Sequence, residues 1–274
     1  MTLRLPAESL SREAILEGLE ASFRARVSLE IHEELPSTNQ HLLDAAVPAS
    51  GHLSVCLAES QSAGRGRRGK VWYSPPYAGL YLSAGWKFHQ IPPDLSALAL
   101  AVGVIARRVM QSETGLSVKL KWPNDLMWAG RKLGGILVEV KEMPQSSCYV
   151  VVGVGLNVTL SELRSGESTQ WPAGAVDLCE AMAGNTPSRV TLAAAFIEGL
   201  VKLAENYGET GFLPYHAEFV AADFLRGHMV ELDDLSGSVL GRAVSVEPDG
   251  FLLLETPAGT HRVSAGDVSV RSLP

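Results

Sequence analysis

A stretch of glycines and arginines is the part of the chain with the clearest potential for chemistry. It consists of Gly64, Arg65, Gly66, Arg67, Arg68 and Gly69. Glycine lets the backbone approach a ligand closely, and guanidinium groups donate paired hydrogen bonds to phosphate or carboxylate. Residues 60–93 contain no Asp or Glu, although the whole chain has a formal net charge of −7. We therefore expect this loop to bind an anionic small ligand, with a solvated basic loop as the alternative.

The same stretch matches the G-x-G-x-x-G pattern of dinucleotide-binding folds, but we reject that interpretation. The pattern requires a helix directly after the glycines and an acidic residue about 20 positions further on. Here Pro75 and Pro76 follow closely, and no acidic residue occurs between the glycines and Pro93.

A second segment places a lysine beside glycines at the start of a predicted strand. Lys132 precedes Gly134 and Gly135, which leave room for a ligand against the strand. Just upstream lie Lys121, Trp122, Pro123, Asn124 and Asp125. Taken alone, Lys132 could equally be an exposed hairpin lysine, and Asn124 with Asp125 an ordinary turn pair.

A third segment has two glycines inside an otherwise apolar strand. Gly153 and Gly155 weaken that strand, and the usual reason for such glycines is a ligand or another backbone packed on that face. Asn157 follows with one amide donor group and one acceptor. The alternative is a β-bulge with a satisfied asparagine. Trp72 could stack on a flat ring, or simply pack beside its proline pair.

The elements that position these segments follow from hydrophobic periodicity and breaker residues. Helices are predicted over residues 9–24, from 37 or 38 to 43, and over 94–111, 191–207 and 212–225. Strands are predicted over 27–32, 53–59, 80–88, 118–122, 131–140 and 149–158. From residue 228, short β-rich segments alternate with turns, which predicts a small antiparallel barrel. We expect domains at 1–227 and 228–274, with the core of the first starting near residue 27.

Composition narrows the class of protein. Hydrophobic residues make up 46% and charged residues 19%, which is enough to fill a core. The net negative charge of the chain argues against a surface that binds nucleic acid. Three separated cysteines without a CxxC pair, and histidines without HxH or HxxxH spacing, argue against disulfides or a dedicated metal site. With neither a signal peptide nor a long apolar run evident, we expect a cytoplasmic protein without membrane attachment.

Taken in order, these segments resemble the bacterial biotin protein ligases. The resemblance covers roughly residues 27–274 and rests on Ser37 to Asn39, Glu59 to Gly69, Lys121 to Asp125, Lys132 to Glu139, Gly153 to Asn157, and a C-terminal SH3-like segment ending at Gly266 to Arg271. It implies an α+β fold with a mixed central sheet, flanking helices and a small C-terminal SH3-like barrel. It also implies activation of biotin by ATP and transfer of the biotinyl group to a protein lysine.

The resemblance further implies roles for matching residues. Lys132 and Arg67 would be catalytic. Biotin would contact Ser37, Thr38, Asn39, Gln61, Arg65, Gly66, Arg67, Lys132, Gly135, Gly153 and Gly155. ATP and the adenylate would contact Arg67, Arg68, Trp72, Lys121, Asn124, Asp125 and Asn157. No dedicated metal site is implied, although Mg²⁺ would accompany ATP, near Asn124 and Asp125.

The implied protein partner is the biotin carboxyl carrier protein of acetyl-CoA carboxylase or a related carboxylase, and a homodimer is compatible. About 26 residues precede the first predicted strand, too few for the winged helix-turn-helix of some members, so we expect a form without that domain and without nucleic-acid binding. A lipoate or octanoate ligase is the nearest rival, and the glycine–arginine loop and the C-terminal barrel favour biotin. Two further hypotheses without catalysis are a nucleic-acid-binding regulator and an adaptor that binds partners through the barrel.

Overall fold

The computed structural model describes residues 9–160, 174–234, 237–265 and 269–272. Its helices are α1 (Arg12–Glu17), α2 (Ala21–Arg24), α3 (Thr38–Asp44), η1 (Arg67–Gly69), η2 (Leu95–Ala97), α4 (Leu98–Thr114), α5 (Leu178–Ala181), α6 (Arg189–Thr210) and α7 (Leu213–Ala222). The strands of the larger part are β1 (Val27–Leu35), β2 (Leu53–Gln61), β3 (Gly79–Phe88), β4 (Lys119–Lys121), β5 (Asp125–Trp128), β6 (Arg131–Met143) and β7 (Ser147–Asn157). The C-terminal strands are β8 (Met229–Asp234), β9 (Gly237–Val246), β10 (Leu252–Thr256), β11 (Gly259–Val263) and β12 (Ser269–Ser272).

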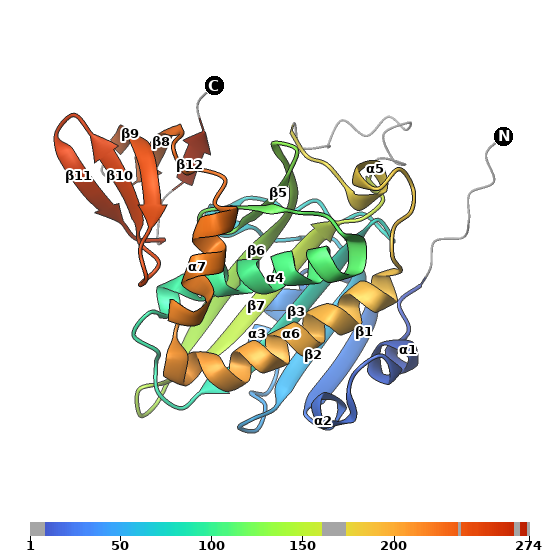
Figure 1. Cartoon of the computed structure of the whole chain (residues 1–274). Helices are drawn as coiled ribbons and strands as arrows, with labels where there is room; N and C mark the ends of the chain where they lie inside the picture. The colour runs from blue at the N-terminus through green and yellow to red at the C-terminus, as the bar shows by residue number, and fades with distance from the viewer. Residues whose placement is uncertain (1–8, 161–173, 235–236, 266–268, 273–274) are drawn as a thin grey trace.

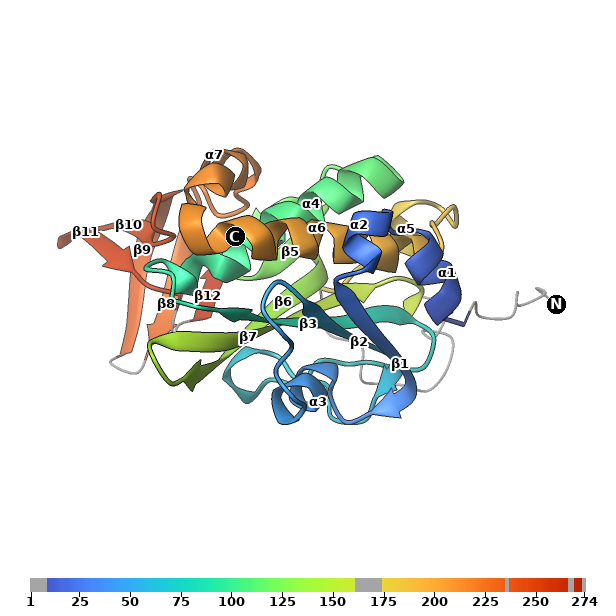
Figure 2. The ribbon, with the colours of Figure 1, turned by 90° about the horizontal axis from the view of Figure 1, so that it is seen from below.

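A seven-stranded mixed sheet forms the centre of the larger part, in the order β1-β2-β3-β7-β6-β5-β4. Only β1 and β2 run parallel, and the other neighbours are antiparallel. Helices α4 and α6 cover one face of the sheet, and the short helix α3 lies on the opposite face (Figures 1 and 2). A second, five-stranded antiparallel sheet has the order β11-β10-β9-β8-β12. These features confirm the predicted α+β class with a small C-terminal β unit.

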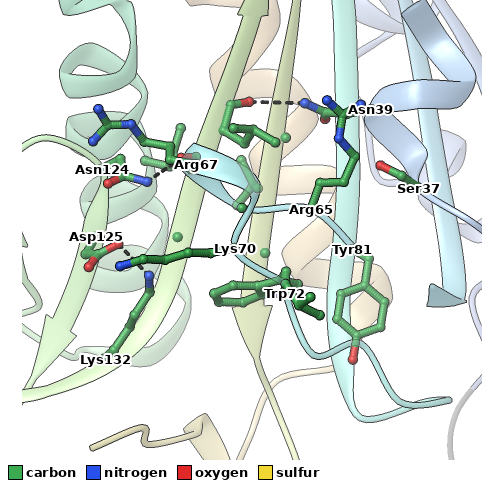
Figure 3. A pocket seen from close by; sticks show the side chains of 18 of the residues that line it. Ser37, Asn39, Arg65, Arg67, Lys70, Trp72, Tyr81, Asn124, Asp125 and Lys132 are labelled. Atoms are coloured by element: carbon green, nitrogen blue, oxygen red, sulfur yellow. Dashed lines mark hydrogen bonds and ion pairs between the residues drawn. The ribbon is translucent and has the colours of Figure 1, made fainter. Parts of the chain in front are cut away.

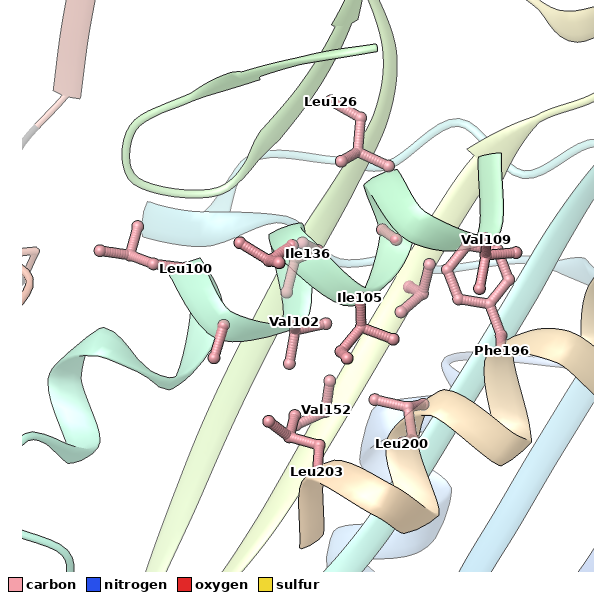
Figure 4. Close-up of a cluster of buried hydrophobic side chains, with 14 of the residues drawn as sticks. Leu100, Val102, Ile105, Val109, Leu126, Ile136, Val152, Phe196, Leu200 and Leu203 are labelled. Carbon is pink, nitrogen blue, oxygen red and sulfur yellow. The ribbon is translucent and has the colours of Figure 1, made fainter. Parts of the chain in front are cut away.

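The main core lies between the central sheet and the pair α4–α6, where Ile105, Val152, Phe196 and Leu200 meet (Figure 4). Each fully buried side chain of this kind contributes about 1.5–3 kcal/mol to folding. The two helices approach closely at Gly199, where an added Cβ would lie 2.4 Å from a methyl carbon of Ile105.

Residues Leu95–Thr114 are the one helical stretch in the described ranges that is long and apolar enough to cross a membrane, by length and composition alone. In this fold the stretch packs between the sheet, α6 and α7, and most of it is buried. Its apolar character is therefore that of a core helix. It runs three residues beyond the predicted end at 111 and stops at Gly115, which has the left-handed conformation with φ +71°.

Two predicted helices differ in the structure. The single helix expected over residues 9–24 is two short helices, because the first ends at Gly18 and the chain bends before Ala21. The helix expected over 94–111 begins with the 3₁₀ turn η2 before α4. Of the C-terminal segment expected at Gly266 to Arg271, residues 266–268 lie outside the described residues, and the rest falls in β12.

Candidate active site

A single cavity gathers nearly all the residues that the sequence singled out. It lies on the α3 side of the central sheet, under the loop of residues 64–71, and encloses about 200 Å³. Its lining includes Ser37, Thr38, Asn39, Gln61, Arg65, Gly66, Arg67, Arg68, Trp72, Lys121, Asn124, Asp125, Lys132, Gly135, Gly153 and Gly155. Ser37 and Asn39 lie on one side of the cavity and Asn124, Asp125 and Lys132 on the other, with Trp72 between them (Figure 3).

The α3 side of the cavity carries a neutral polar network. Ser37 caps α3 by accepting a 3.4 Å hydrogen bond from the amide of Gln40. The Thr38 amide donates to Gln61 Oε1 at 2.9 Å. The Ser83 hydroxyl lies 2.7 Å from Thr38 Oγ1 and 2.6 Å from Asn39 Oδ1. Such a network of fixed donors and acceptors suits a ligand with uncharged amide-like groups.

The glycines of β7 make room for two of these side chains. A Cβ on Gly153 would lie 2.4 Å from Asn39 Oδ1, and one on Gly155 would lie 2.5 Å from the Trp72 ring. The sequence had predicted a ligand or a backbone on this face. The groups that the glycines admit are protein side chains, and both of those side chains line the cavity.

The opposite side of the cavity is cationic. Lys132 Nζ forms an ion pair with Asp125 Oδ1 at 2.6 Å and lies 5.4 Å from the centre of the Trp72 ring. Lys121 and Lys70 also line the cavity. Burial lowers the pKa of Lys121, and the neighbouring charges of Lys132 and Lys70 lower it further against the opposing effect of Asp125. One carboxylate therefore faces three ammonium groups, an arrangement that favours an anion.

The glycine–arginine loop closes over the cavity as a small hairpin, in which the Gly66 amide donates to Lys70 O at 2.7 Å. Arg68 and Gly69 have positive φ angles of 56° and 70°, which turn the chain back. Arg65 pairs with Glu139 at 2.6 Å. Arg67 donates to the carbonyl of Ala265, and Arg68 donates to Asp233 O at 3.3 Å. The loop thus joins the central sheet to the C-terminal sheet.

Two predicted site residues hold backbone groups with their side chains. Asn157 is absent from the cavity lining, and its amide donates to the carbonyls of Val176 at 2.9 Å and Lys132 at 3.4 Å. Asn124 does line the cavity, but its amide nitrogen donates to Ile136 O at 2.8 Å. Both asparagines therefore position strand β6, which carries Lys132.

No role was predicted for the side chains of Ser83 and Glu139, which the structure brings to the site. Ser83 on β3 is paired with Gly153 on β7, and its side chain joins the polar network. Glu139 Oε2 accepts from the Asn39 amide at 3.0 Å, while its other oxygen accepts from Arg65. Glu139 belongs to the segment Lys132 to Glu139. Its contact with Asn39 depends on how α3 packs on β6, which the sequence does not show.

Comparison with known proteins gives two family matches. Residues 32–157 match the biotin/lipoate A/B protein ligase family, and residues 227–271 match the biotin protein ligase C-terminal domain. The bifunctional ligase/repressor BirA of Escherichia coli is 33% identical over 97% of this chain and 80% of its own length. The biotin–[acetyl-CoA-carboxylase] ligase of Mycobacterium tuberculosis is 32% identical over 97% of this chain and 96% of its own.

Among solved structures, the biotin protein ligase of Aquifex aeolicus in complex with biotin and ATP has the same fold. Its TM-score is 0.74 at 24% identity, covering 90% of this chain and 99% of that one. Together with the family matches and the relatives above 30% identity, this likeness shows that the chain belongs to the biotin/lipoate protein ligase family.

Proposed function

We propose that this chain is an ATP-dependent biotin protein ligase that makes biotinyl-5′-adenylate and passes the biotinyl group to a lysine of a carrier protein. One observation carries the assignment of the site. A single cavity joins a neutral polar side to a cationic side across Trp72, and the substrate has a neutral ring system joined to a carboxylate.

The neutral side is assigned to the biotin ring. Ser37, Thr38, Asn39 and Gln61 offer hydroxyl and amide groups of the kind that pair with the cyclic urea of biotin. The hydroxyl of Ser83 holds the side chains of Thr38 and Asn39 in place by hydrogen bonds. The groups are therefore oriented before a ligand arrives, which lowers the entropic cost of binding. Gly153 and Gly155 admit the side chains of Asn39 and Trp72 to this wall, Gly135 lies beside Trp72 and Lys132, and Arg65 and Gly66 are assigned to cover the ring.

The cationic side is assigned to the carboxylate and the ATP phosphates. A carboxylate oxygen of biotin attacks the α-phosphorus of ATP, the bond to the β-phosphate oxygen breaks, and pyrophosphate leaves. Both reactants are anions, so fixed positive charge lowers their repulsion and stabilises the charge that develops. Lys132 and Arg67 are assigned that role, with Lys121 and Arg68 toward the phosphates. Trp72, Asn124 and Asp125 are assigned to positions beside the nucleotide.

In the second half-reaction the ε-amine of an acceptor lysine attacks the acyl carbon, AMP leaves, and the amine proton passes to solvent. The acceptor is assigned as the biotin carboxyl carrier protein of acetyl-CoA carboxylase or a related carboxylase, as the name of the Mycobacterium tuberculosis relative suggests. We also infer a cytoplasmic enzyme, in keeping with its free cysteines, that can form homodimers.

Mg²⁺ is expected with ATP, and the residues present fit it. Mg²⁺ is usually bound through one or two carboxylates together with substrate phosphates. Asp125 supplies a carboxylate on the cationic side. Asn124 uses its side-chain nitrogen to bind the carbonyl of Ile136, so its side-chain oxygen is the atom that would face the ion. When bound, Mg²⁺ would neutralise phosphate charge, and Asp125 would exchange its pairing with Lys132 for the ion.

The test is pyrophosphate exchange into ATP, with biotin, lipoate or octanoate as the only acid supplied. Exchange that depends on biotin alone, followed by biotin transfer to a carrier domain, is the expected result. Exchange with lipoate or octanoate would keep the fold and change the substrate. Folded protein that catalyses no exchange with any acid, and that is retained on heparin at physiological salt, would favour a nucleic-acid-binding regulator.

A further inference from the structure

Outside the cavity, a cluster of metal-ligating side chains lies where α3 crosses β1 and β2. One nitrogen each of His32 and His41 and the sulfur of Cys56 all lie within 4.8 Å of one another. Glu30 joins them, with its Oε2 2.9 Å from His41 Nε2 and 3.3 Å from His32 Nε2. None of these four residues belongs to the proposed biotin or ATP site.

The sheet register places these residues together. Parallel pairing sets Glu30 of β1 opposite Cys56 of β2, so both side chains project from the same face. His32 is two residues along β1 from Glu30 and shares that face. Helix α3 lies over the face and adds His41, while its neighbour Leu42 packs with Cys56 in a separate apolar cluster.

The donors have the identity that a transition metal ion requires. Imidazole, thiolate and carboxylate are each ligand types that Zn²⁺ binds in tetrahedral sites, and this cluster supplies two, one and one of them. The thiolate and the carboxylate together neutralise a divalent ion. Tetrahedral zinc ligands lie about 3.5 Å apart, so the present atoms need to move inward by roughly 1 Å. The rings of His32 and His41 are about one-third exposed and have room to rotate, and the ion has a path from solvent between them.

We propose that Glu30, His32, His41 and Cys56 form a binding site for Zn²⁺ or a chemically similar divalent ion. The Glu30 carboxylate, which now accepts from both imidazoles, becomes the fourth ligand. The proton of the Cys56 thiol passes to solvent when the metal–sulfur bond forms. The bound ion fastens α3 to β1 and β2, and α3 carries Thr38 and Asn39 of the cavity wall, directly after its N-cap Ser37.

Cobalt(II) is the probe, because a cobalt–thiolate bond gives a near-ultraviolet charge-transfer band that other ligands do not give. The full chain, stripped with a chelator and kept reduced, is titrated with Co²⁺ in the absence of ATP. The expected result is one Co²⁺ per chain with this band, and loss of the band when one equivalent of Zn²⁺ is added. Stoichiometric titration without a thiolate band would overturn the proposal.

Single substitutions locate the ion. Cys56→Ser is expected to abolish the band, whereas Cys148→Ser, which changes the other fully buried cysteine, and Cys179→Ser are expected to retain it. His32→Gln and His41→Gln change partly exposed side chains and keep the thiol, so they test the site even if Cys56→Ser fails to fold. Each is expected to weaken Co²⁺ affinity by at least about tenfold. A band that survives in Cys56→Ser, or unchanged affinity in both histidine variants, would refute the site.

Discussion

At the scale of the residue, Lys132 shows how a hairpin lysine becomes a group suited to chemistry. Its ion pair with Asp125 and its position beside Trp72 hold the ammonium group at the edge of a cavity that already contains Lys121 and Lys70. An anion that enters can take the place of Asp125 as the partner of Lys132. The pair thus holds the ammonium group at the partly exposed mouth of the cavity with its charge balanced until an anion enters.

The first prediction concerns Lys132→Ala. Loss of the ammonium group is expected to lower biotin-dependent pyrophosphate exchange by about 10²–10³-fold, because a fixed charge near the developing negative charge is lost. Lys141→Ala is the matched control, since Lys141 lies on the same strand, β6, and is exposed. Wild-type exchange in Lys132→Ala, with the control also unchanged, would remove Lys132 from the proposed chemistry.

The second prediction concerns Gly153→Ala. The new Cβ would lie 2.4 Å from Asn39 Oδ1 and must displace that side chain from the polar network. We expect about tenfold weaker biotin binding by calorimetry, from a distortion costing roughly 1–3 kcal/mol. Gly103→Ala, in helix α4, is the control, because its new Cβ meets only ordinary contacts of 3.6 Å or more. Equal biotin affinity in the two variants would show that Asn39 does not bind the ring.

Among the elements, the loop of residues 64–71 is closed at its base by its own hydrogen bonds and contacts the C-terminal part at its tip. Its closing hydrogen bonds tie it to its own hairpin, whereas Arg67 and Arg68 reach backbone carbonyls near and within the C-terminal sheet. A loop anchored by a few polar contacts can open and close at small energetic cost. It is therefore suited to covering an intermediate that must be kept and later released.

The third prediction follows from that anchoring. Arg67→Gly removes both a cation over the cavity and the contact with Ala265, so biotinyl-adenylate is expected to dissociate at least about tenfold faster. The measurement is release of radiolabelled adenylate from a preformed complex chased with unlabelled biotin. Arg226→Gly, at an exposed position outside the loop, should release it at the wild-type rate. Unchanged release in Arg67→Gly would contradict the assignment of this loop as a cover.

In the molecule as a whole, the C-terminal sheet is attached to the larger part through the backbone of Gly250, which meets side chains of that part. The indole nitrogen of Trp122 donates to Gly250 O at 3.1 Å, and Gly250 packs against Ala97 at the start of α4. Trp122 itself lines the cavity. The position of the second sheet is thus tied to a wall of the proposed active site.

The fourth prediction tests this junction. Gly250→Ala would place a Cβ 2.4 Å from Ala97 Cβ at a φ of +88°, whereas Gly259→Ala has a φ of +121° and nothing within 4 Å. Both substitutions strain the backbone, but only the first also creates a clash. We expect Gly250→Ala to lower the free energy of unfolding by about 1–3 kcal/mol more than Gly259→Ala in urea titrations. Equal losses would show that the two parts are not rigidly packed at this point.

Local patterns were sufficient for much of the fold. The long helices α4 and α6 and the strands β2, β3, β6 and β7 lie within a few residues of their predicted ranges, because their periodicity reports burial directly. The helix predicted over 9–24 was wrong because Gly18 ends α1 within an otherwise helical pattern of apolar residues. Order and pairing of strands depend on distant contacts, which no local window contains.

The sequence by itself determined which chemistry was available. A glycine–arginine loop without acidic residues and Lys132 beside its glycines predicted a site for an anionic ligand. The resemblance of these segments, taken in order, to the biotin protein ligases predicted the activity, and the family matches confirm that resemblance. These features depend only on residue type and spacing, which the sequence states directly.

The contacts between side chains at the site depend on the tertiary structure and could not be predicted from the sequence. The tertiary structure turned Asn157 away from the cavity, brought Ser83 and Glu139 to Asn39, and explained Gly153 and Gly155 by the side chains they admit. It also brought His32, His41 and Cys56 together, although their spacing along the chain had argued against a metal site. The physical reason is that sheet register and helix packing set these distances, and both arise from burying apolar surface across the whole chain.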